Sequence, residues 1–298
     1  MGWKTVIIGN ECKVSLSMDR LRITTDKDYH NIPLSDLDTV IFSHDKVTIT
    51  IPILAKLVEN NVNVLICDRK NDPIGMFQPF NNHSLVYKKL NSQINWKDAR
   101  KRKLWKMLVV DKIKSEIECL KILGADYRSI DMLMDYKNSV YYDDKTNREA
   151  VAARIYFTAL FGNDFSREQD NYINFALNYG YKIIASYISK CIAARGLLTQ
   201  LGIHHIGESN PFNLTYDFIE PLRAIIDLWV KINVEDNFTV NHKLQIINIL
   251  NYKVNLNNKW IQLNDAIEDL VDSYISFMNE NTDDIYRIDL SKGLKEDV

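Results

Sequence analysis

The sequence predicts an α+β protein in which an N-terminal, sandwich-like β-rich domain is joined to a larger all-α C-terminal domain. Up to about residue 77, short runs rich in Val, Ile and Thr alternate with polar breaks, as strands of half-buried sheets do. From residue 85 onward, apolar residues recur at helical spacing. The chain has 298 residues, of which 46% are hydrophobic, so it is long enough to form two domains with cores of their own.

The N-terminal part contains six predicted strands and one predicted helix. The strands are apolar, β-branched runs that end at polar residues: 5–8, 13–17, 21–24, 37–42, 47–51 and 62–67. The helix covers residues 53–59, whose apolar side chains fall on one face. We therefore assign residues 1–76 to a β-domain and the turn-rich residues 77–92 to a linker.

Residues 93–298 form the predicted helical domain. Apolar stripes that include Trp105, Tyr172 and Ala266 indicate amphipathic helices. Residues 240–259 are rich in Asn and Lys, and we expect a loosely packed loop there. We also expect the acidic tail after Asn281 to be weakly ordered unless a partner holds it.

We expect no segment that would direct the chain out of the cytoplasm. No run approaches the roughly 20 apolar residues that a membrane span needs, and the first ten residues lack the features of a signal peptide. We expect a soluble, cytoplasmic protein with no membrane partner. The four cysteines are far apart and lie in apolar surroundings, so we interpret them as reduced core residues.

The net charge of −2 argues at first against a nucleic-acid partner, but the charges are unevenly distributed. Residues 1–80 carry 9 basic and 10 acidic side chains, residues 81–200 carry 20 and 13, and residues 201–298 carry 8 and 16. The densest basic stretch, residues 88–114, has ten basic side chains against two acidic ones. This asymmetry indicates a surface for a polyanion in the middle third.

The predicted basic helix at residues 97–106 is the candidate for DNA contact. Its charges surround the whole circumference, which suits either phosphate contact or a merely solvated helix, and Trp96 and Trp105 are available for stacking or for packing. The candidate DNA-binding residues are Lys97, Arg100, Lys101, Arg102, Lys103 and Lys106.

Glu149 lies at the start of a predicted helix and has two interpretations. Thr146 and Glu149 have the spacing of a capping box, in which both side chains satisfy free backbone N–H groups. Alternatively, the small residues that follow Glu149 bring it into a close helix contact, where a carboxylate is costly unless it binds something.

A second candidate segment joins a histidine pair to an acidic pair. His204 and His205 lie in a loop, and Asp217 and Glu220 are three residues apart on a predicted helix, so both carboxylates can converge on one point. Pro221 cannot donate to the carbonyl of Asp217 and so kinks the helix or locates its first turn. Two carboxylates and an imidazole suit Mn²⁺ or Mg²⁺ better than a structural zinc site. The alternative is a turn histidine and a solvated helix face.

These segments, in this order, resemble the CRISPR-associated integrase and endonuclease family, the universal Cas protein one of spacer acquisition. The matching stretches are residues 147–150, the pair at 204–205, the Asn-Pro-Phe-Asn-Leu run at 210–214 and residues 217–223. The resemblance covers nearly the full length and is closest to type II-A members. It implies a sandwich-like N-terminal domain, a flexible linker and a larger helical catalytic domain.

The resemblance also implies the site residues. Glu149 matches the first ligand of the family, and Glu220 matches the acidic ligand of the last helix, where many members have Asp. His205 is preferred as the imidazole because its spacing to the acidic pair fits better, with His204 as the alternative. Asp217 matches a nearby acidic position that assists the ligands. The implied cofactor is Mg²⁺ or Mn²⁺, held by Glu149, His205 and Glu220.

The implied activity is a metal-dependent transesterification. The 3′-hydroxyl of a protospacer duplex attacks a phosphodiester at the leader end of a CRISPR repeat and displaces a 3′-hydroxyl on the repeat strand. The family further implies a homodimer through the β-domain, and a heterohexamer with a small ferredoxin-like CRISPR-associated partner. It also implies contact with the effector nuclease complex.

Two other functions are compatible with the same residues. One is a non-catalytic DNA-binding or assembly subunit whose acidic cluster is structural. The other is a general metal-dependent nuclease for branched DNA or RNA. An integration assay with a protospacer duplex and a repeat-bearing plasmid separates the three.

Overall fold

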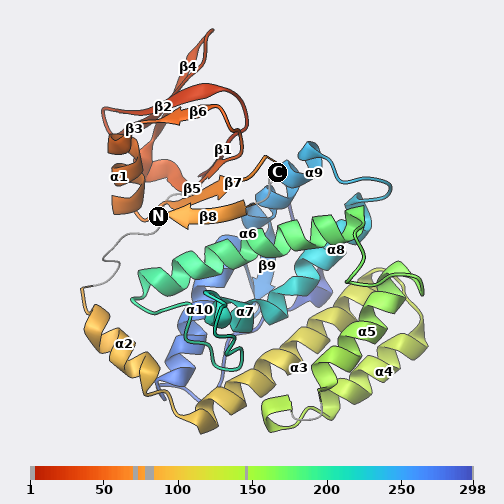
Figure 1. Cartoon of the computed structure of the whole chain (residues 1–298). Coiled ribbons are helices and arrows are strands. Elements are labelled where there is room, and N and C mark those ends of the chain that lie inside the picture. Colours follow the sequence, from red (N-terminus) through yellow and green to blue (C-terminus); the bar gives the residue numbers. More distant parts are fainter. Residues whose placement is uncertain (1–3, 70–72, 78–83, 145–146, 297–298) are drawn as a thin grey trace. The chain divides into compact units, whose positions relative to one another are not determined.

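In the computed structural model, residues 4–69, 73–77, 84–144 and 147–296 are described, and residues 78–83 of the predicted linker lie outside them. The chain divides into two units (Figure 1). One comprises residues 1–86 with 193–196, and the other comprises residues 87–192 with 197–298.

Among its described residues, the first unit has two four-stranded sheets, as a sandwich-like β-domain requires. The first sheet has the order β1 (Lys4–Ile8), β5 (Leu37–Phe42), β7 (Asn63–Cys67), β8 (Pro73–Phe77). The second has the order β4 (Tyr29–Pro33), β3 (Arg20–Thr24), β2 (Cys12–Ser17), β6 (Val47–Ile49). The 3₁₀ turn η1 (Leu34–Asp36) precedes β5, and helix α1 (Ile51–Glu59) follows β6.

The core of this unit explains why the alternating pattern identified its strands. Apolar side chains from both sheets and from α1 are completely buried in one cluster, including Val14, Leu21, Val40, Ile53, Leu57 and Val64. Each of the six predicted strands overlaps an observed one. The two strands that were missed, β4 and β8, lie at sheet edges and contain polar residues or Pro, which weakens the strand signal.

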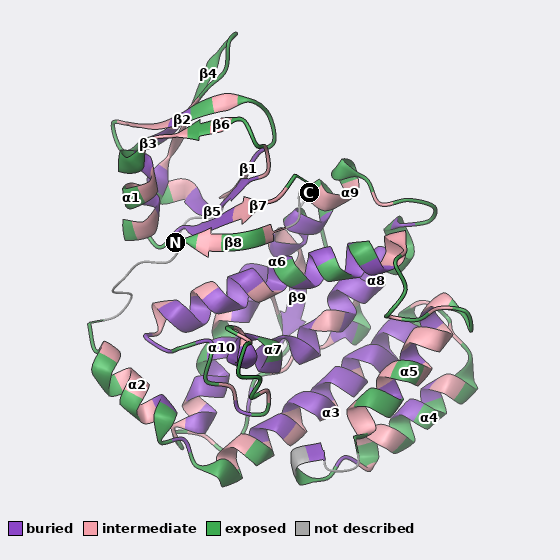
Figure 2. Ribbon diagram, viewed as in Figure 1, coloured by how far each residue is buried: buried purple, intermediate pink, exposed green. Residues whose placement is uncertain are grey.

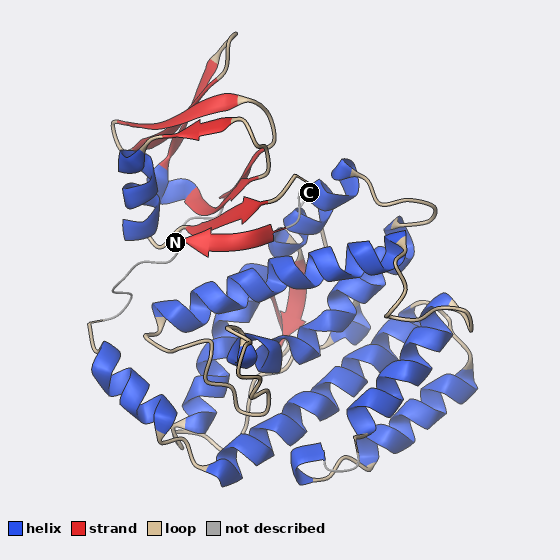
Figure 3. Cartoon of the chain, viewed as in Figure 1, coloured by secondary structure: helices blue, strands red, loops and turns tan. Residues whose placement is uncertain are grey.

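Helices make up most of the rest of the chain (Figure 3). In chain order they are α2 (Val86–Ile94), α3 (Asp98–Ile122), α4 (Tyr127–Asn138), η2 (Tyr142–Asp144), α5 (Arg148–Phe161), α6 (Tyr172–Ala194), α7 (Asn213–Ile219), η3 (Glu220–Leu222), α8 (Arg223–Asn233), α9 (Val240–Asn248), η4 (Ile249–Asn251), α10 (Leu263–Met278) and η5 (Leu290–Lys292). None of the helices within the described residues has the length and apolarity to cross a membrane.

Helix α3 is the central element of the second unit and is buried over most of its length (Figure 2). It contacts α4, α5, α7, η3, α8 and α10. Its buried residues include the apolar stripe of Trp105 and Leu108 but also the charged Lys112 and Glu116. Charged groups so placed need partners inside the protein, because water cannot solvate them there.

Two segments that were expected to be loose are ordered, and both expectations were wrong. Residues 240–259 form α9, η4 and most of a hairpin of β9 (Lys253–Leu256) with β10 (Lys259–Gln262), which adds two strands to the mainly helical unit. The acidic tail is held because its apolar residues Ile285 and Leu290 are buried, and the Leu290 N–H donates to Oε2 of the buried Glu118 at 2.8 Å.

The cysteines form no disulfide among the described residues. Cys119 and Cys191 are buried, as predicted, whereas Cys12 and Cys67 are only half-buried.

Candidate active site

Glu149 is placed by the cap of helix α5. The two carboxylate oxygens of Asp144 accept hydrogen bonds from the backbone N–H groups of Arg148 and Glu149, both at 2.9 Å. An acceptor at this position satisfies donors that a helix start leaves free. Thr146, the other half of the predicted capping box, lies outside the described residues. The Glu149 side chain itself binds Lys112 on α3.

Glu220 is placed by a break between two helices. Pro221 lies at the start of the 3₁₀ turn η3, which separates α7 from α8, as its missing N–H predicted. The predicted helix that carries Asp217 and Glu220 is therefore divided by a tight turn into α7 and α8. Glu220 begins that turn and is 3% exposed.

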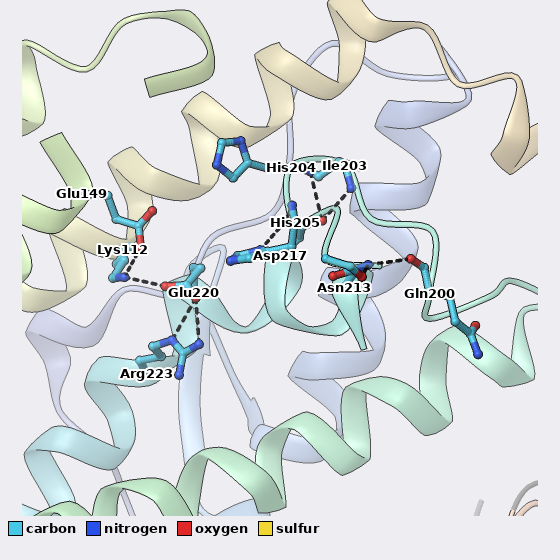
Figure 4. A network of polar contacts seen from close by, with 11 residues as sticks. Lys112, Glu149, Gln200, Ile203, His204, His205, Asn213, Asp217, Glu220 and Arg223 are labelled. Carbon is cyan, nitrogen blue, oxygen red and sulfur yellow. Dashed lines mark hydrogen bonds and ion pairs between the residues drawn. The ribbon is translucent and has the colours of Figure 1, made fainter. Parts of the chain in front are cut away.

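Lys112 lies between the two glutamates (Figure 4). Its Nζ donates to Oε1 of Glu149 at 2.6 Å and to Oε2 of Glu220 at 2.5 Å. The other oxygen of Glu220 accepts two hydrogen bonds from Arg223, from Nε at 3.0 Å and from Nη2 at 2.8 Å. Glu149 and Glu220 thus converge on one cation, and Glu220 is held by a second one.

Burial and charge compete in setting the pKa values of this cluster. Burial alone would raise the pKa of Glu220, but the charges of Arg223 and Lys112 outweigh it and lower that pKa to about 2. Burial would likewise lower the pKa of Lys112, but the charges of Glu220 and Glu149 raise it above its ordinary value. Both members of this buried ion pair are therefore charged at neutral pH.

Two further buried carboxyl groups border the cluster and behave differently. Burial raises the pKa of Glu116 to about 8, and among the described residues its Oε2 has no hydrogen-bond partner. Burial also raises the pKa of Asp227 to about 6, although Tyr181 and Tyr156 donate hydrogen bonds to it. Within the described residues neither group forms an ion pair, whereas Glu220 forms two, so the nearby cations lower their pKa values less than burial raises them.

Asp217 organises the histidine loop. Its carboxylate accepts the backbone N–H groups of Ile203 at 2.6 Å, His204 at 3.2 Å and His205 at 3.0 Å. The turn requires Gly202, since a Cβ there would lie 2.2 Å from the carbonyl oxygen of His205 and 2.8 Å from Oδ2 of Asp217. A completely buried carboxylate therefore fixes the loop that carries both histidines.

The two histidines have different environments. Nδ1 of His205 lies 2.7 Å from Oδ1 of Asp217, and this hydrogen bond raises the pKa of the imidazole against the opposing effect of burial. The negative charges of Asp217, Glu220 and Glu149 add to the rise. His204 instead stacks on Trp105, with ring centroids 4.0 Å apart. His205, the preferred imidazole, is the one that lies between Asp217 and Glu220 (Figure 4).

The structure brings the predicted acidic residues together in a different way than expected. Asp217 and Glu220 do not converge on one point: Asp217 binds the histidine loop, and Glu220 binds Lys112 and Arg223. Glu149 is the carboxylate that meets Glu220. No three His, Cys, Asp or Glu side chains in the described part of the chain are grouped closely enough to hold a metal ion as they stand.

Sequence reasoning missed two cations of this site. Lys112 was counted in the basic stretch, although it follows Trp105 by seven residues and Leu108 by four and so belongs to the apolar face of α3. A lysine on an apolar helix face could have predicted a buried carboxylate partner. Arg223 lies three residues after Glu220, which in the predicted helix is the spacing of a side-chain pair.

A hollow of about 530 Å³ opens beside His205. It is lined by Gln93 and Lys101 on one side and by residues of the loop from Gln200 to Asn213 on the other. Asn213 braces this loop, because its side-chain amide donates to the carbonyl oxygens of Gln200 at 3.1 Å and Gly207 at 3.0 Å. The hollow gives a substrate room next to the imidazole.

The predicted DNA-binding residues form a partly neutralised surface. Lys97 and Arg100 form ion pairs with Glu280, and Arg100 also pairs with Asp283. Lys101 lies 3.6 Å from Asp98. The other three candidates have aromatic neighbours or solvent around them: Lys103 lies over Phe277, Lys106 lies over Tyr142, and Arg102 is exposed. A second hollow, of about 520 Å³, lies among these basic residues and Glu280.

Comparison with known proteins gives a consistent result. A family model described as CRISPR associated protein Cas1 matches residues 5–241. The CRISPR-associated endonuclease Cas1 of Neisseria meningitidis serogroup C (strain 8013) is 33% identical to the chain over 279 residues, which cover 92% of this chain and 91% of the relative.

Solved structures share the fold. A casposase bound to integration product has a TM-score of 0.77 at 18% identity and covers 98% of this chain and 94% of its own. A chain of a Cas6-RT-Cas1–Cas2 complex has a TM-score of 0.72 at 16% identity, over 94% of this chain and 35% of that one. The predicted α+β fold class is confirmed.

Proposed function

The chain belongs to the CRISPR-associated Cas1 family, and from this premise we propose that it is a metal-dependent nuclease and integrase of CRISPR adaptation. The observation that carries the proposal is the convergence of Glu149 and Glu220 on a single cation, with His205 beside them. The two carboxylates come from separate helical segments. Holding two like charges so close together costs free energy of folding, unless a bound cation compensates for them.

The donor set fits a divalent cation. Glu149, Glu220 and His205 supply two carboxylates and an imidazole, which suit Mg²⁺ or Mn²⁺. The ammonium of Lys112 already marks a point where a positive charge is bound by both carboxylates. Asp217 engages Nδ1 of His205, as carboxylates do behind metal-ligating histidines, and so leaves Nε2 for a ligand. When bound, the cation would polarise the phosphodiester and stabilise charge on the attacking and leaving oxygens.

The protein's own residues position the reaction. The side chains of Glu149 and His205 are 25% and 38% exposed, so this side of the site is open to a DNA strand, whereas Glu220 is enclosed. The 3′-hydroxyl of a protospacer end loses its proton, and its oxygen forms a bond to phosphorus at the leader end of the repeat. The bond from that phosphorus to the 3′-oxygen of the repeat strand breaks, and this oxygen takes up a proton. Asp217 fixes the orientation of His205 throughout.

The partners are part of the same proposal. The name of the Cas6-RT-Cas1–Cas2 complex supports a Cas2-type partner for this chain. We therefore expect a homodimer through the β-domain and a heterohexamer with that small partner, bound to protospacer and leader-repeat DNA through the basic start of α3. Membership of a type II-A system, with its effector nuclease, stays a prediction.

An integration assay tests the proposal. Purified protein, its partner, Mn²⁺ or Mg²⁺, a protospacer duplex and a plasmid with a CRISPR repeat should give joined products. Glu149→Gln and His205→Ala should abolish joining while they still bind DNA, and His204→Ala should retain more activity than His205→Ala. Folded Glu149→Gln and His205→Ala proteins that join as well as wild type would make the acidic cluster structural, as in a non-catalytic assembly subunit. Cutting of branched DNA without joining would favour the general nuclease.

A further inference from the structure

The proposed function assigns no role to Lys112, although its ammonium lies where Glu149 and Glu220 meet. Its Nζ is 2.6 Å from Oε1 of Glu149 and 2.5 Å from Oε2 of Glu220, and its side chain is only 10% exposed. A divalent cation held by the same two oxygens would lie about 2.1 Å from each. The ammonium and the metal ion need the same space and repel each other, so they exclude each other.

Arg223 is not in conflict with a metal ion in this way. It binds Oε1 of Glu220, whereas Lys112 and the proposed metal position involve Oε2. The planar guanidinium forms two hydrogen bonds with that oxygen and fixes the carboxylate in place. Lys112 is therefore the cation that has to move.

Glu116 offers the displaced ammonium a new partner. It follows Lys112 by one turn of α3, a spacing at which two side chains are neighbours. Glu116 is 3% exposed, and within the described part of the chain its Oε2 accepts no hydrogen bond. A buried carboxyl oxygen without a partner is costly, and the flexible stem of a lysine lets its ammonium change partner.

We propose that Lys112 is a built-in counter-ion that holds Glu149 and Glu220 together in the metal-free protein and moves to Glu116 when a divalent cation binds. The proposal rests on the proposed function, because it takes Glu149 and Glu220 as the ligands. Its consequence is that the affinity for metal is set by a competition inside the chain, and that the carboxylates stay paired before the metal arrives.

The first part of the proposal, that Lys112 competes with the metal ion, is tested by titration of Mn²⁺ into the purified, metal-free, full-length protein. Free Mn²⁺ is measured by electron paramagnetic resonance. Lys112→Met should bind Mn²⁺ at least about tenfold more tightly, because a unit charge a few ångströms from the dication has been removed. Lys112→Gln should behave in the same way and keeps the test open if the methionine variant does not fold. Lys114→Met is the matched control, since Lys114 lies two residues along α3 and pairs with Glu118 at 3.4 Å. Unchanged or weaker binding in both Lys112 variants overturns the proposal.

The second part, that the ammonium of Lys112 moves to Glu116, is tested by a double-mutant cycle. Glu116→Met should weaken Mn²⁺ binding several-fold when Lys112 is present, because the displaced ammonium then has no acceptor, and should have no effect in the Lys112→Met background. Equal weakening in both backgrounds would mean that Glu116 acts on the metal directly, which overturns the movement to Glu116.

The same titration separates this inference from the proposed function. Wild-type protein that binds no Mn²⁺ at millimolar concentration overturns both the displacement and the metal dependence. Wild-type protein that binds Mn²⁺ while the Lys112 variants match it overturns only the displacement.

Discussion

Two clusters of carboxylates and cations in the helical unit differ in the burial of their central carboxylate. The first surrounds Glu220, whose side chain is 4% exposed and is bound by Lys112 and Arg223. The second surrounds Glu280, whose side chain is 43% exposed and is paired with Lys97 and Arg100. The residue types are the same. In the first cluster, the balance of burial and charge lowers the pKa of Glu220 to about 2 and raises that of the neighbouring Glu116 to about 8. Burial, rather than the presence of opposite charges, makes an ion pair a potential active site here.

The largest expected difference between the clusters is in stability. Glu220→Ala should lower the free energy of unfolding of the metal-free protein by about 3–5 kcal/mol, because it leaves Lys112 and Arg223 as uncompensated buried charges. Glu280→Ala is the matched control. Its unfolding midpoint should stay within experimental error of wild type, because the side chain of Lys97 is 68% exposed to water and Arg100 keeps its ion pair with Asp283. Urea unfolding followed by circular dichroism measures both. Equal losses would show that burial does not distinguish the two clusters.

The next effect is the pH dependence of stability that arises from the buried cluster. The pKa of Glu116 rises from 4.5 to about 8 on folding, so between these pH values the folded state keeps a proton that the unfolded state has released. Because of this group, the free energy of unfolding of the wild-type protein falls as the pH rises, by roughly 1.4 kcal/mol per pH unit. Glu220, with its pKa lowered to about 2, acts in the opposite sense: its contribution is present above pH 4.5 and is lost as the pH falls toward 2.

Glu116→Gln isolates the first of these contributions. The variant should be more stable than wild type at pH 8, and the difference should vanish near pH 5, in thermal unfolding measured with EDTA present. Parallel pH profiles of the two proteins would contradict a raised pKa at this position.

The fold could be predicted from the sequence better than the site. The alternating pattern of the β-domain and the apolar stripes of the helices depend on residues close together in the sequence, so they identified most elements in order. The family motif pointed to Glu149, His205 and Glu220, and the structure brings the two glutamates onto one cation. The buried position of Lys112 was not predicted, because a basic stretch suggests an exposed surface. The partners of Arg100 were not predicted either, because they lie about 180 residues away in the sequence and leave no local pattern.

Asp217→Asn should have an intermediate effect on activity. The carboxylate accepts backbone N–H groups on both of its oxygens, so an amide directs its own N–H₂ toward one of these donors and loosens the histidine loop. Loss of a group that orients a metal-ligating histidine typically costs about 10–100-fold in activity. The integration assay measures the loss, and the nitrogen chemical shifts of His205 report its tautomer. Tyr216→Phe, a neighbouring change on α7, is the control; an Asp217→Asn protein with full activity and an unchanged tautomer would mean that the loop holds itself.

The smallest effect is expected at the exposed cluster, and it concerns DNA rather than stability. Glu280 and Asp283 occupy Lys97 and Arg100, which are two of the six candidate DNA-binding residues. Glu280→Gln combined with Asp283→Asn should free these cations for phosphates. The slope of log K against log salt should then steepen by about 0.9 for each additional phosphate that the protein neutralises.

The control for this variant has to separate local pairing from net charge. Glu235→Gln combined with Asp236→Asn removes the same two charges from an exposed turn after α8, so it changes the overall attraction to DNA equally. A steeper slope only in the Glu280 and Asp283 variant would mean that the acidic residues compete with phosphate for the start of α3. Equal slopes in the two variants would mean that Lys97 and Arg100 serve the fold alone, and the DNA surface would then have to be sought among Arg102, Lys103 and Lys106, which have no carboxylate partner among the ion pairs of the described residues.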